Sequence, residues 1–184
     1  MDISNRTALI IGGTSGIGLG LARRFAAAGS TAIVAGRDTS HFEGFETVTI
    51  DVTDPPSVTA ARNQVLAEHP DLDVVVTMAV VMIPEDLRDP NHFPQAEMTI
   101  EVNLLGTIRV IDAFIEHLLA QGRGDIVTVS SGIAFLPFPL MPSYGASKAG
   151  CTPIRKPFAR NWPERVCTSP NWSRRPLPRT RRAG

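Results

Sequence analysis

Short apolar runs and longer amphipathic stretches alternate along the first 150 residues. Five runs are rich in Val, Ile and Thr and are bounded by glycine or polar residues, a pattern typical of buried strands. These runs cover residues 6–13, 31–37, 46–51, 72–80 and 125–131. Three intervening stretches repeat apolar residues at helical spacing, over residues 16–29, 55–69 and 97–122. The alternation predicts βαβ units and therefore an α/β fold built on a parallel sheet.

The same pattern predicts how the first two helices are packed and capped. Ile17, Leu21 and Phe25 recur at helical spacing and are expected to form one apolar stripe. Gly29 follows that helix and suits its C-terminal cap, because glycine readily adopts a positive φ. Asp54 precedes the second helix, and its carboxylate can accept a hydrogen bond from a free N–H of the first turn.

The net charge of zero is the sum of two oppositely charged parts. Residues 1–150 contain 17 acidic and 9 basic residues, a charge of −8, whereas residues 151–184 have a charge of +8. The second part also contains both tryptophans, both cysteines and six of the 15 prolines. Because it has few apolar residues to bury, it cannot easily offset its ordering entropy. We therefore expect one domain over 1–150 and an aberrant, poorly ordered Arg/Pro-rich tail over 151–184.

Composition also excludes several classes of protein. No apolar run is long enough to cross a membrane, and the N-terminus lacks the features of an export signal, so a cytoplasmic protein is expected. Cys151 and Cys167 show neither a disulfide framework nor zinc-ligand spacing. The arginine-rich tail lacks a nucleic-acid-binding module, and no nucleic-acid partner is expected.

A glycine-rich turn follows the first predicted strand in the segment "IGGTSGIG". Gly12, Gly16 and Gly18 allow the backbone to turn sharply and to approach a pyrophosphate. The phosphates would then lie at the positive N-terminus of the next helix. A tight turn with close helix packing is the alternative explanation of these glycines.

Further motifs occur with this turn in a characteristic order, and the most specific is "VSSG…SYGASKAG", in which Ser131 lies thirteen residues before Tyr144. Over residues 5–150 the chain resembles the tyrosine-dependent short-chain dehydrogenases/reductases. The resemblance implies a Rossmann-like, doubly wound parallel sheet in three α/β/α layers, without the last strands of the family fold. The motifs that carry it are Gly12-x-x-x-Gly16-x-Gly18, Asp51-Val52, Asn103, Ser131 and Tyr144-x-x-x-Lys148.

Tyr144 and Lys148 are four residues apart and therefore lie on one face of a helix. A free phenol, with a pKa near ~10, is a poor base at neutral pH, but a nearby cation favours the phenolate. We therefore expect Tyr144 to be the general acid/base. The resemblance implies that Ser131 holds the substrate oxygen, that Lys148 also binds the nicotinamide ribose, and that Asn103 serves a water-linked proton relay. Taken singly, each residue also has an ordinary explanation. Tyr144 and Lys148 could be an exposed pair on a helix, Ser131 could merely end a strand, and Asn103 could be a hydrogen-bonded polar group in a helix.

Cofactor preference depends on the end of the second predicted strand. Arg37 suits the 2′-phosphate of NADP(H), so NADP is predicted over NAD, although Asp38 opposes a phosphate by its charge. Asp51 is expected near the adenine, with a strand-end turn as its alternative role. The full set of expected cofactor contacts is Gly12, Thr14, Ser15, Gly16, Ile17, Gly18, Arg37, Asp51, Val52 and Ala79.

Two residues on the fourth predicted strand depart from the family pattern. Thr77 stands where the family usually has asparagine, and Val80 stands where it has glycine. The asparagine amide is therefore missing, and a branched side chain lies close to the expected path of the cofactor. We expect weaker cofactor binding as a result.

Two further groups of residues have no assigned chemistry. The apolar segment 133–142 lies between Ser131 and Tyr144, and it either lines a substrate pocket or packs in the core. The four histidines show no metal-ligand spacing, and no metal is expected. They are predicted to be solvated surface residues: His41, His69, His92 and His117.

The helix that begins at Ser143 is expected to break near Thr152. Pro153 and Pro157 each remove a backbone donor and clash with the preceding turn, at a cost of roughly 3 kcal/mol. The family continues with two more strands and a substrate lid. We expect residues after about 150 to be an out-of-frame translation of a longer gene, the alternative being a diverged short member.

The resemblance also bears on assembly. The family usually pairs subunits through the helices that carry Asn103 and Tyr144, and a broken second helix would weaken such a homo-oligomer. The fifth strand would also have an open apolar edge.

These observations predict an oxidoreductase that transfers a hydride between NADP(H) and a small carbonyl or secondary alcohol substrate. The alternatives are a nucleotide-binding or sensing protein without turnover, and an inert truncated product. The substrate itself is not predicted, because the lid that usually selects it has no counterpart in the sequence.

Overall fold

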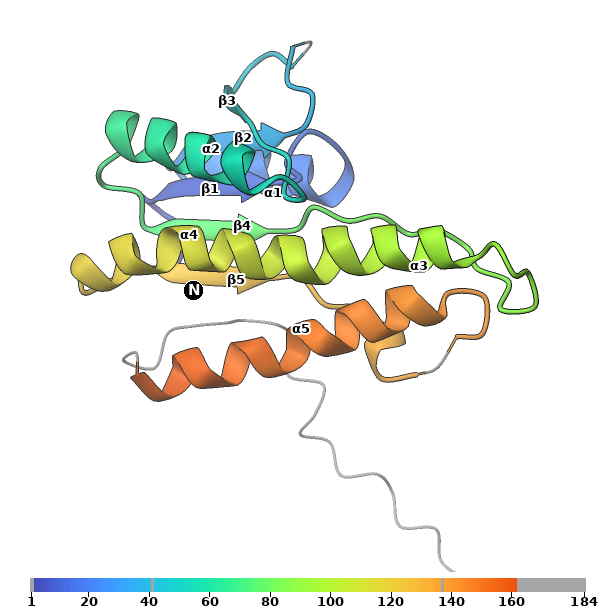
Figure 1. Ribbon diagram of the computed structural model, residues 1–184. Helices are drawn as coiled ribbons and strands as arrows, with labels where there is room; N and C mark the ends of the chain where they lie inside the picture. The colour runs from blue at the N-terminus through green and yellow to red at the C-terminus, as the bar shows by residue number, and fades with distance from the viewer. Residues whose placement is uncertain (1, 41, 137, 162–184) are drawn as a thin grey trace, which may run out of the picture.

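A computed structural model describes the backbone of residues 2–161 except residues 41 and 137, and the side chains of this range as far as Thr152. Its centre is a parallel sheet of five strands in the order β3-β2-β1-β4-β5 (Figure 1). The strands are β1 (Thr7–Ile11), β2 (Thr31–Gly36), β3 (Glu46–Thr49), β4 (Val74–Thr77) and β5 (Asp125–Thr128). Each of the five predicted strands is present, and the doubly wound parallel arrangement is confirmed.

Helices connect the strands and continue beyond β5. Their bounds are α1 (Gly16–Ala27), α2 (Pro55–Glu68), α3 (Phe93–Ile100), the π-helical segment η1 (Glu101–Leu105), α4 (Gly106–Ala120), the short 3₁₀ helix η2 (Gly132–Ala134) and α5 (Pro142–Asn161). In the described residues, no helix combines the length and apolarity that a membrane crossing requires.

The predicted caps of α1 and α2 are confirmed. Gly29 lies just beyond α1 with a φ of +78°, and its N–H donates to the carbonyl of Ala26. The carboxylate of Asp54 accepts a hydrogen bond from the N–H of Ser57 at 3.2 Å. Both ends are therefore fixed by local chemistry that is readable from the sequence.

Two apolar cores lie on opposite faces of the sheet. On one face, side chains of β1 and its neighbours pack against α2 and α4, with Phe114 and Val65 fully buried. On the other face, Ile10 and Val76 pack with Phe25 of α1. Figure 1 shows α2 and α4 in front of the strands and α1 behind them. These are the three α/β/α layers that the sequence predicts.

The helical packing differs from prediction in two places. Ile17 is 80% exposed rather than part of the buried stripe of α1, because it lies in the first turn, beyond the sheet. The stretch 97–122 is not one regular helix, because η1 interrupts it between α3 and α4. Such π-helical insertions are rare and are frequent at functional sites.

Helix α5 is longer than predicted. It continues from Pro142 to Asn161, so the expected break near Thr152 is wrong. A proline removes one hydrogen bond and displaces the preceding turn, but a helix can accommodate this by bending instead of ending. Pro153 and Pro157 are four residues apart, so both missing donors lie on the same side of the helix. The predicted poor order of the tail concerns residues that lie largely outside the described range.

Strand β5 is the last strand of the described sheet. It pairs with β4 along one side, and its second half, Val127 and Thr128, is only half-buried. The expectation that β5 lies at an edge is therefore confirmed for the part of the chain that the structure describes.

A partly buried ion cluster ties the amino ends of three strands together. Arg6 precedes β1, and its guanidinium donates to Asp73 at 2.6 Å and to Asp125 at 2.8 Å. Both carboxylates are 7% exposed, and Asp73 also accepts a hydrogen bond from the N–H of Thr7 at 3.1 Å. Arg6 therefore joins β1 to Asp73, which leads into β4, and to Asp125, the first residue of β5.

We expect Arg6→Ala to lower the free energy of unfolding by about 2–3 kcal/mol, because it leaves two largely buried carboxylates without their cation. Urea denaturation followed by far-UV circular dichroism measures this change. Arg88→Ala is the matched control: Arg88 pairs with Asp86 at 2.8 Å, but the two side chains are 90% and 53% exposed. Its loss should stay below about 0.5 kcal/mol, and equal losses for the two variants would contradict the role of Arg6.

Candidate active site

The glycine-rich turn brings the ends of β1 and β4 into close backbone contact. Gly12 has a φ of +84°, and a Cβ at this position would lie 2.8 Å from the backbone nitrogen of Ala79. A Cβ at Gly18 would overlap the carbonyl oxygen of Gly12. The turn is also held to β2, since the N–H of Gly12 donates to the carbonyl of Ala35 at 2.8 Å. Side chains are excluded here, as the predicted cradle requires.

The N-terminus of α1 opens from this turn. Ser15 is the N-cap, but its side chain makes no capping hydrogen bond, and the first turn contains no acidic residue. Gly16 has a φ of +51°, and a Cβ there would meet no atom within 4 Å. Free N–H groups and the helix dipole favour an anion at such a terminus. The turn therefore fits a pyrophosphate.

The end of β2 places Arg37 beside the turn. Gly36 faces Thr14, since a Cβ at Gly36 would lie 3.0 Å from the Cγ2 of Thr14. Arg37 follows Gly36 and is exposed. Asp38, the residue of opposite charge next to it, accepts hydrogen bonds from the N–H of Ser40 at 3.0 Å and from its hydroxyl at 2.6 Å.

The side chains of Asp51 and Val52 both stabilise the local structure. The carboxylate of Asp51 accepts hydrogen bonds from the N–H of Thr53 at 2.9 Å and from its hydroxyl at 2.7 Å. These bonds, helped by the more distant charge of Arg37, lower the pKa of Asp51. Val52 is 5% exposed, and Gly106 of α4 makes room for it. The alternative role of Asp51, a turn at a strand end, is thus present, and the Val52 side chain lies in the core.

The two departures from the family pattern, Thr77 at the end of β4 and Val80 after it, have different surroundings. Thr77 is buried, and its hydroxyl lies 3.5 Å from the hydroxyl of Thr107 on α4. Val80 is 49% exposed and follows directly on Ala79, the residue that Gly12 approaches. An exposed branched residue therefore directly follows the strand end that the glycine turn approaches.

Tyr144 and Lys148 lie one turn apart on α5. The Nζ atom of Lys148 is 5.9 Å from the centre of the Tyr144 ring and donates to the carbonyl of Val129, just after β5, at 3.0 Å. Burial lowers the pKa of Lys148, and the nearby Cys151 opposes that shift. Tyr144 is half-buried, and its hydroxyl makes no hydrogen bond to the described residues.

Ser131 lies where η2 meets the first turn of α5. Its hydroxyl oxygen accepts a hydrogen bond from the N–H of Ile133 at 3.4 Å, so it caps η2. Ile133 contacts Gly145, where a Cβ would lie 3.3 Å from its Cγ2 atom. The neighbouring Ser130 donates to the carbonyl of Lys148 at 3.1 Å. Ser131 and the Tyr144–Lys148 turn are therefore brought to the same end of β5.

The side chain of Asn103 is committed to structural hydrogen bonds. Asn103 lies in η1 and is fully buried. Its Oδ1 accepts from the N–H of Val81 at 2.8 Å, and its Nδ2 donates to the Val81 carbonyl at 2.8 Å and to the Ser147 hydroxyl at 3.2 Å. Asn103 thus fastens the segment after β4 to α5.

The apolar segment 133–142 is not core packing. Four of its large side chains are exposed, from 43% for Phe138 to 75% for Phe135, with Leu136 and Leu140 between them, while Ile133 and Met141 are half-buried at the surface of the segment's two ends. Of the two interpretations that the sequence leaves open, the one in which these side chains pack in the core is wrong.

The histidines are less solvated than predicted. His69, His92 and His117 are half-buried, while His41 lies outside the described residues. His117 lies 3.3 Å from the carbonyl of Leu72, and His92 has a buried Nδ1 atom. The prediction of solvated surface residues is wrong for these three, because the ends of the helices that carry them pack against the body of the protein.

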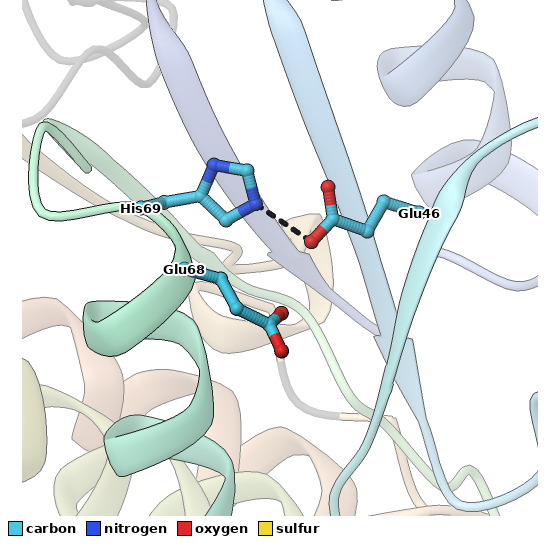
Figure 2. Close-up of side chains that lie close together, drawn as sticks. All are labelled: Glu46, Glu68 and His69. Carbon is cyan, nitrogen blue, oxygen red and sulfur yellow. Dashed lines mark hydrogen bonds and ion pairs between the residues drawn. The ribbon is translucent and has the colours of Figure 1, made fainter.

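His69 takes part in the one group of three possible metal ligands found among the described residues. Figure 2 shows Glu46 of β3 facing His69, just after α2, with Glu68 beside them. Ligand atoms of all three lie within 4.8 Å of one another. The Nε2 atom of His69 lies 2.6 Å from Oε1 of Glu46, so this contact ties the end of α2 to the outer strand β3.

Sequence reasoning missed the residues that join these parts. Val81 and Ser147 are the partners of Asn103, and the carboxylate of Glu85 contacts Ser143 at the start of α5. Val81 and Glu85 belong to no motif, whereas Ser143 and Ser147 lie within the motif around Tyr144 but have no role assigned by it. Their contacts join segments far apart in the chain. The burial of Glu85, an acidic residue in a loop, is the one feature that points to a role, and it is visible only in the folded structure.

Known proteins share this arrangement. The model of the short chain dehydrogenase family matches residues 6–168. An uncharacterized oxidoreductase of Bacillus subtilis, DltE, is 33% identical over 158 residues, which are 81% of this chain and 62% of the relative. The 2-dehydro-3-deoxy-D-gluconate 5-dehydrogenase of B. subtilis is 28% identical over 173 residues, 88% of this chain and 66% of the relative.

Solved structures agree with these relatives. A protein described as a short chain dehydrogenase/reductase is 30% identical with a TM-score of 0.77, covering 88% of this chain and 70% of that one. A variant of actinorhodin polyketide ketoreductase with NADPH is 25% identical with a TM-score of 0.79, covering 85% of this chain and 65% of that one.

The chain spans about half to two thirds of the length of the first curated relatives, between 53% and 66%. The family match nevertheless includes the glycine turn, all five strands and the Tyr144–Lys148 pair, and it continues past Gly150. This chain therefore belongs to the short-chain dehydrogenase family of oxidoreductases.

Proposed function

We propose that this chain transfers a hydride between NADP(H) and a carbonyl or secondary alcohol, with Tyr144 as the general acid/base. One observation carries the proposal: Tyr144 and a buried Lys148 on α5 lie at the end of β5, near which Ser131 caps η2. In a parallel sheet the carboxyl ends of the strands meet at one edge, so the glycine cradle after β1 lies at this edge as well.

The acid/base role follows from the surroundings of Tyr144. Its hydroxyl is free of hydrogen bonds to the described residues, and the ammonium of Lys148 lies near its ring. During reduction, the Tyr144 hydroxyl donates a proton to the carbonyl oxygen. Lys148 stabilises the phenolate that remains, because a nearby cation favours the charged form of a phenol. Ser131 donates a hydrogen bond to the same substrate oxygen.

The cofactor would supply or accept the hydride, and the chain's residues would hold it in place. The pyrophosphate fits the side-chain-free turn at Gly12 and the uncapped N-terminus of α1. Arg37, exposed at the end of β2, would bind the 2′-phosphate that distinguishes NADP from NAD. The exposed Val80 beside the cradle narrows this path and would weaken binding.

The exposed apolar side chains before α5 favour a substrate with a bulky apolar part. Phe135 and Leu136 are 75% and 73% exposed, and they follow η2, which packs on the first turn of α5. Apolar surface next to catalytic groups favours apolar ligands. The polyketide ketoreductase among the similar structures is consistent with a substrate of this kind.

We expect Tyr144→Phe to lower turnover by about a thousandfold, because it removes the proton donor and keeps the ring. The change in nicotinamide absorbance with a panel of ketones and alcohols measures turnover. The dissociation constant for NADPH, from its fluorescence, should stay within about threefold of the unmodified value. Equal turnover of the two proteins would refute the role of Tyr144. Tight NADPH binding without turnover by the unmodified chain would instead favour the nucleotide-sensing alternative.

Arg37→Ala should weaken NADPH binding at least about tenfold, because a charge-assisted bond to phosphate contributes about 1.5–3 kcal/mol. NADH affinity should change by less than about twofold, since NADH lacks that phosphate. Fluorescence titration with both cofactors gives the comparison. Arg23→Ala is the control, because Arg23 is also exposed but lies on α1. A parallel loss of NADH and NADPH affinity would argue against a phosphate contact.

We expect Gly12→Ala to cost about 2 kcal/mol or more of stability, since its φ of +84° and the 2.8 Å approach to Ala79 exclude a Cβ. NADPH binding should fall at least about tenfold as the turn shifts. Gly20→Ala provides the matched control: Gly20 is inside α1 with open space around it. That change should stabilise the protein by up to about 1 kcal/mol. If both variants bind NADPH equally, the cradle is misassigned.

A further inference from the structure

Glu85 places a buried carboxylate against the start of α5. It lies in the segment between β4 and α3, and its side chain is fully buried. Oε1 accepts a hydrogen bond from the N–H of Ser143 at 3.2 Å, and Oε2 accepts one from the Ser143 hydroxyl at 2.7 Å. The N–H of Glu85 donates to the carbonyl of Leu140 at 3.0 Å. Glu85 therefore holds the residues on both sides of the helix start.

Helix α5 has no local residue that could take this role. Met141 precedes the helix and has no capping oxygen, Pro142 has no N–H, and the first turn contains no acidic residue. The free N–H groups of a first turn need an acceptor, and an anion there is stabilised by the helix dipole. Glu85, 58 residues earlier in the chain than Ser143, supplies both.

A second buried polar atom faces the same carboxylate. Nδ1 of His92, the residue before α3, lies 3.9 Å from Oε2 of Glu85. This nitrogen is buried and has no hydrogen-bond partner among the described residues. A buried carboxylate is costly unless it is paired. Ser143 donates hydrogen bonds to the Glu85 carboxylate, and His92 lies next to it. The segment after β4, the start of α3 and the start of α5 therefore meet at Glu85.

We propose that Glu85 is a positioning residue that sets the place of Tyr144 relative to Lys148. Tyr144 directly follows Ser143, which Glu85 holds. Lys148 is anchored separately, through the carbonyl of Val129. Loss of the Glu85 carboxylate therefore loosens the turn that carries Tyr144 and leaves the lysine in place. Glu85 itself does not touch the substrate, and only the turnover part of its test rests on the proposed function.

Hydrogen exchange of the backbone amides that follow Tyr144 measures how firmly its turn is held. In Glu85→Ala this turn loses its anchor at Ser143. Amide exchange of Gly145–Ser147 should become at least about tenfold faster, since these N–H groups close the first turn. Glu116→Ala, which removes an exposed acid on α4, should leave this exchange unchanged.

Glu85→Gln separates positioning from charge. The amide oxygen can still accept from the N–H of Ser143 while the amide nitrogen donates to the Ser143 hydroxyl oxygen, so exchange should stay within about threefold of the unmodified protein. If Glu85 acted only by its negative charge, both variants would speed exchange by similar amounts, because both remove that charge. That result, or no change in either variant, would overturn the proposal.

Two further measurements complete the test. If Glu85→Ala does not fold, Ser143→Ala removes one donor of the same contact and should speed the exchange of the same amides; exchange identical to that of the unmodified protein would count against the proposal. For turnover, kcat of Glu85→Ala should fall about tenfold with an unchanged KM for NADPH, because misplacement affects the chemical step. An unmodified chain without turnover would refute the proposed function, while amide exchange would still decide the role of Glu85.

Discussion

The arrangement of the site depends on the close approach of two backbones, Gly12 after β1 and Ala79 after β4. A side chain at Gly12 would overlap the Ala79 nitrogen, so glycine alone allows the two strand ends to meet. The neighbouring strands β1 and β4 are paired from Ala8 to Ile11, which fixes this approach by register. The glycine turn, the exposed Val80 and the segment that carries Glu85 all begin at this close contact between the two strand ends.

A second set of contacts joins this cradle to α5. Lys148 and Ser130 link the helix to the end of β5, and Asn103 links it to Val81. Three of these bonds join a side chain to a backbone group of a distant segment, and the bond between Asn103 and Ser147 joins two side chains. The turn that carries Tyr144 is therefore placed partly by buried polar groups, which makes its geometry sensitive to the loss of single hydrogen bonds.

The sequence predicts those features that depend on local chemistry. The five strands, the positive φ of Gly29 and the capping carboxylate of Asp54 were all readable, because each depends on neighbours within a few residues. The predicted break at Thr152 failed because local cost alone does not decide where a helix ends. Glu85 could not be found in this way, because its partner lies 58 residues away and only the fold brings them together.

The hydrogen bonds of Asn103 restrict how this residue can take part in proton transfer. Its amide is used by Val81 and Ser147, and its backbone carbonyl has contacts of its own. That carbonyl accepts a hydrogen bond from the Thr107 hydroxyl at 2.8 Å and a longer one from the Cys151 thiol at 3.5 Å. Burial raises the pKa of Cys151, which keeps the thiol neutral and its hydrogen bond weak. Cys151 therefore adds a weak contact between α5 and the π-helical segment that carries Asn103.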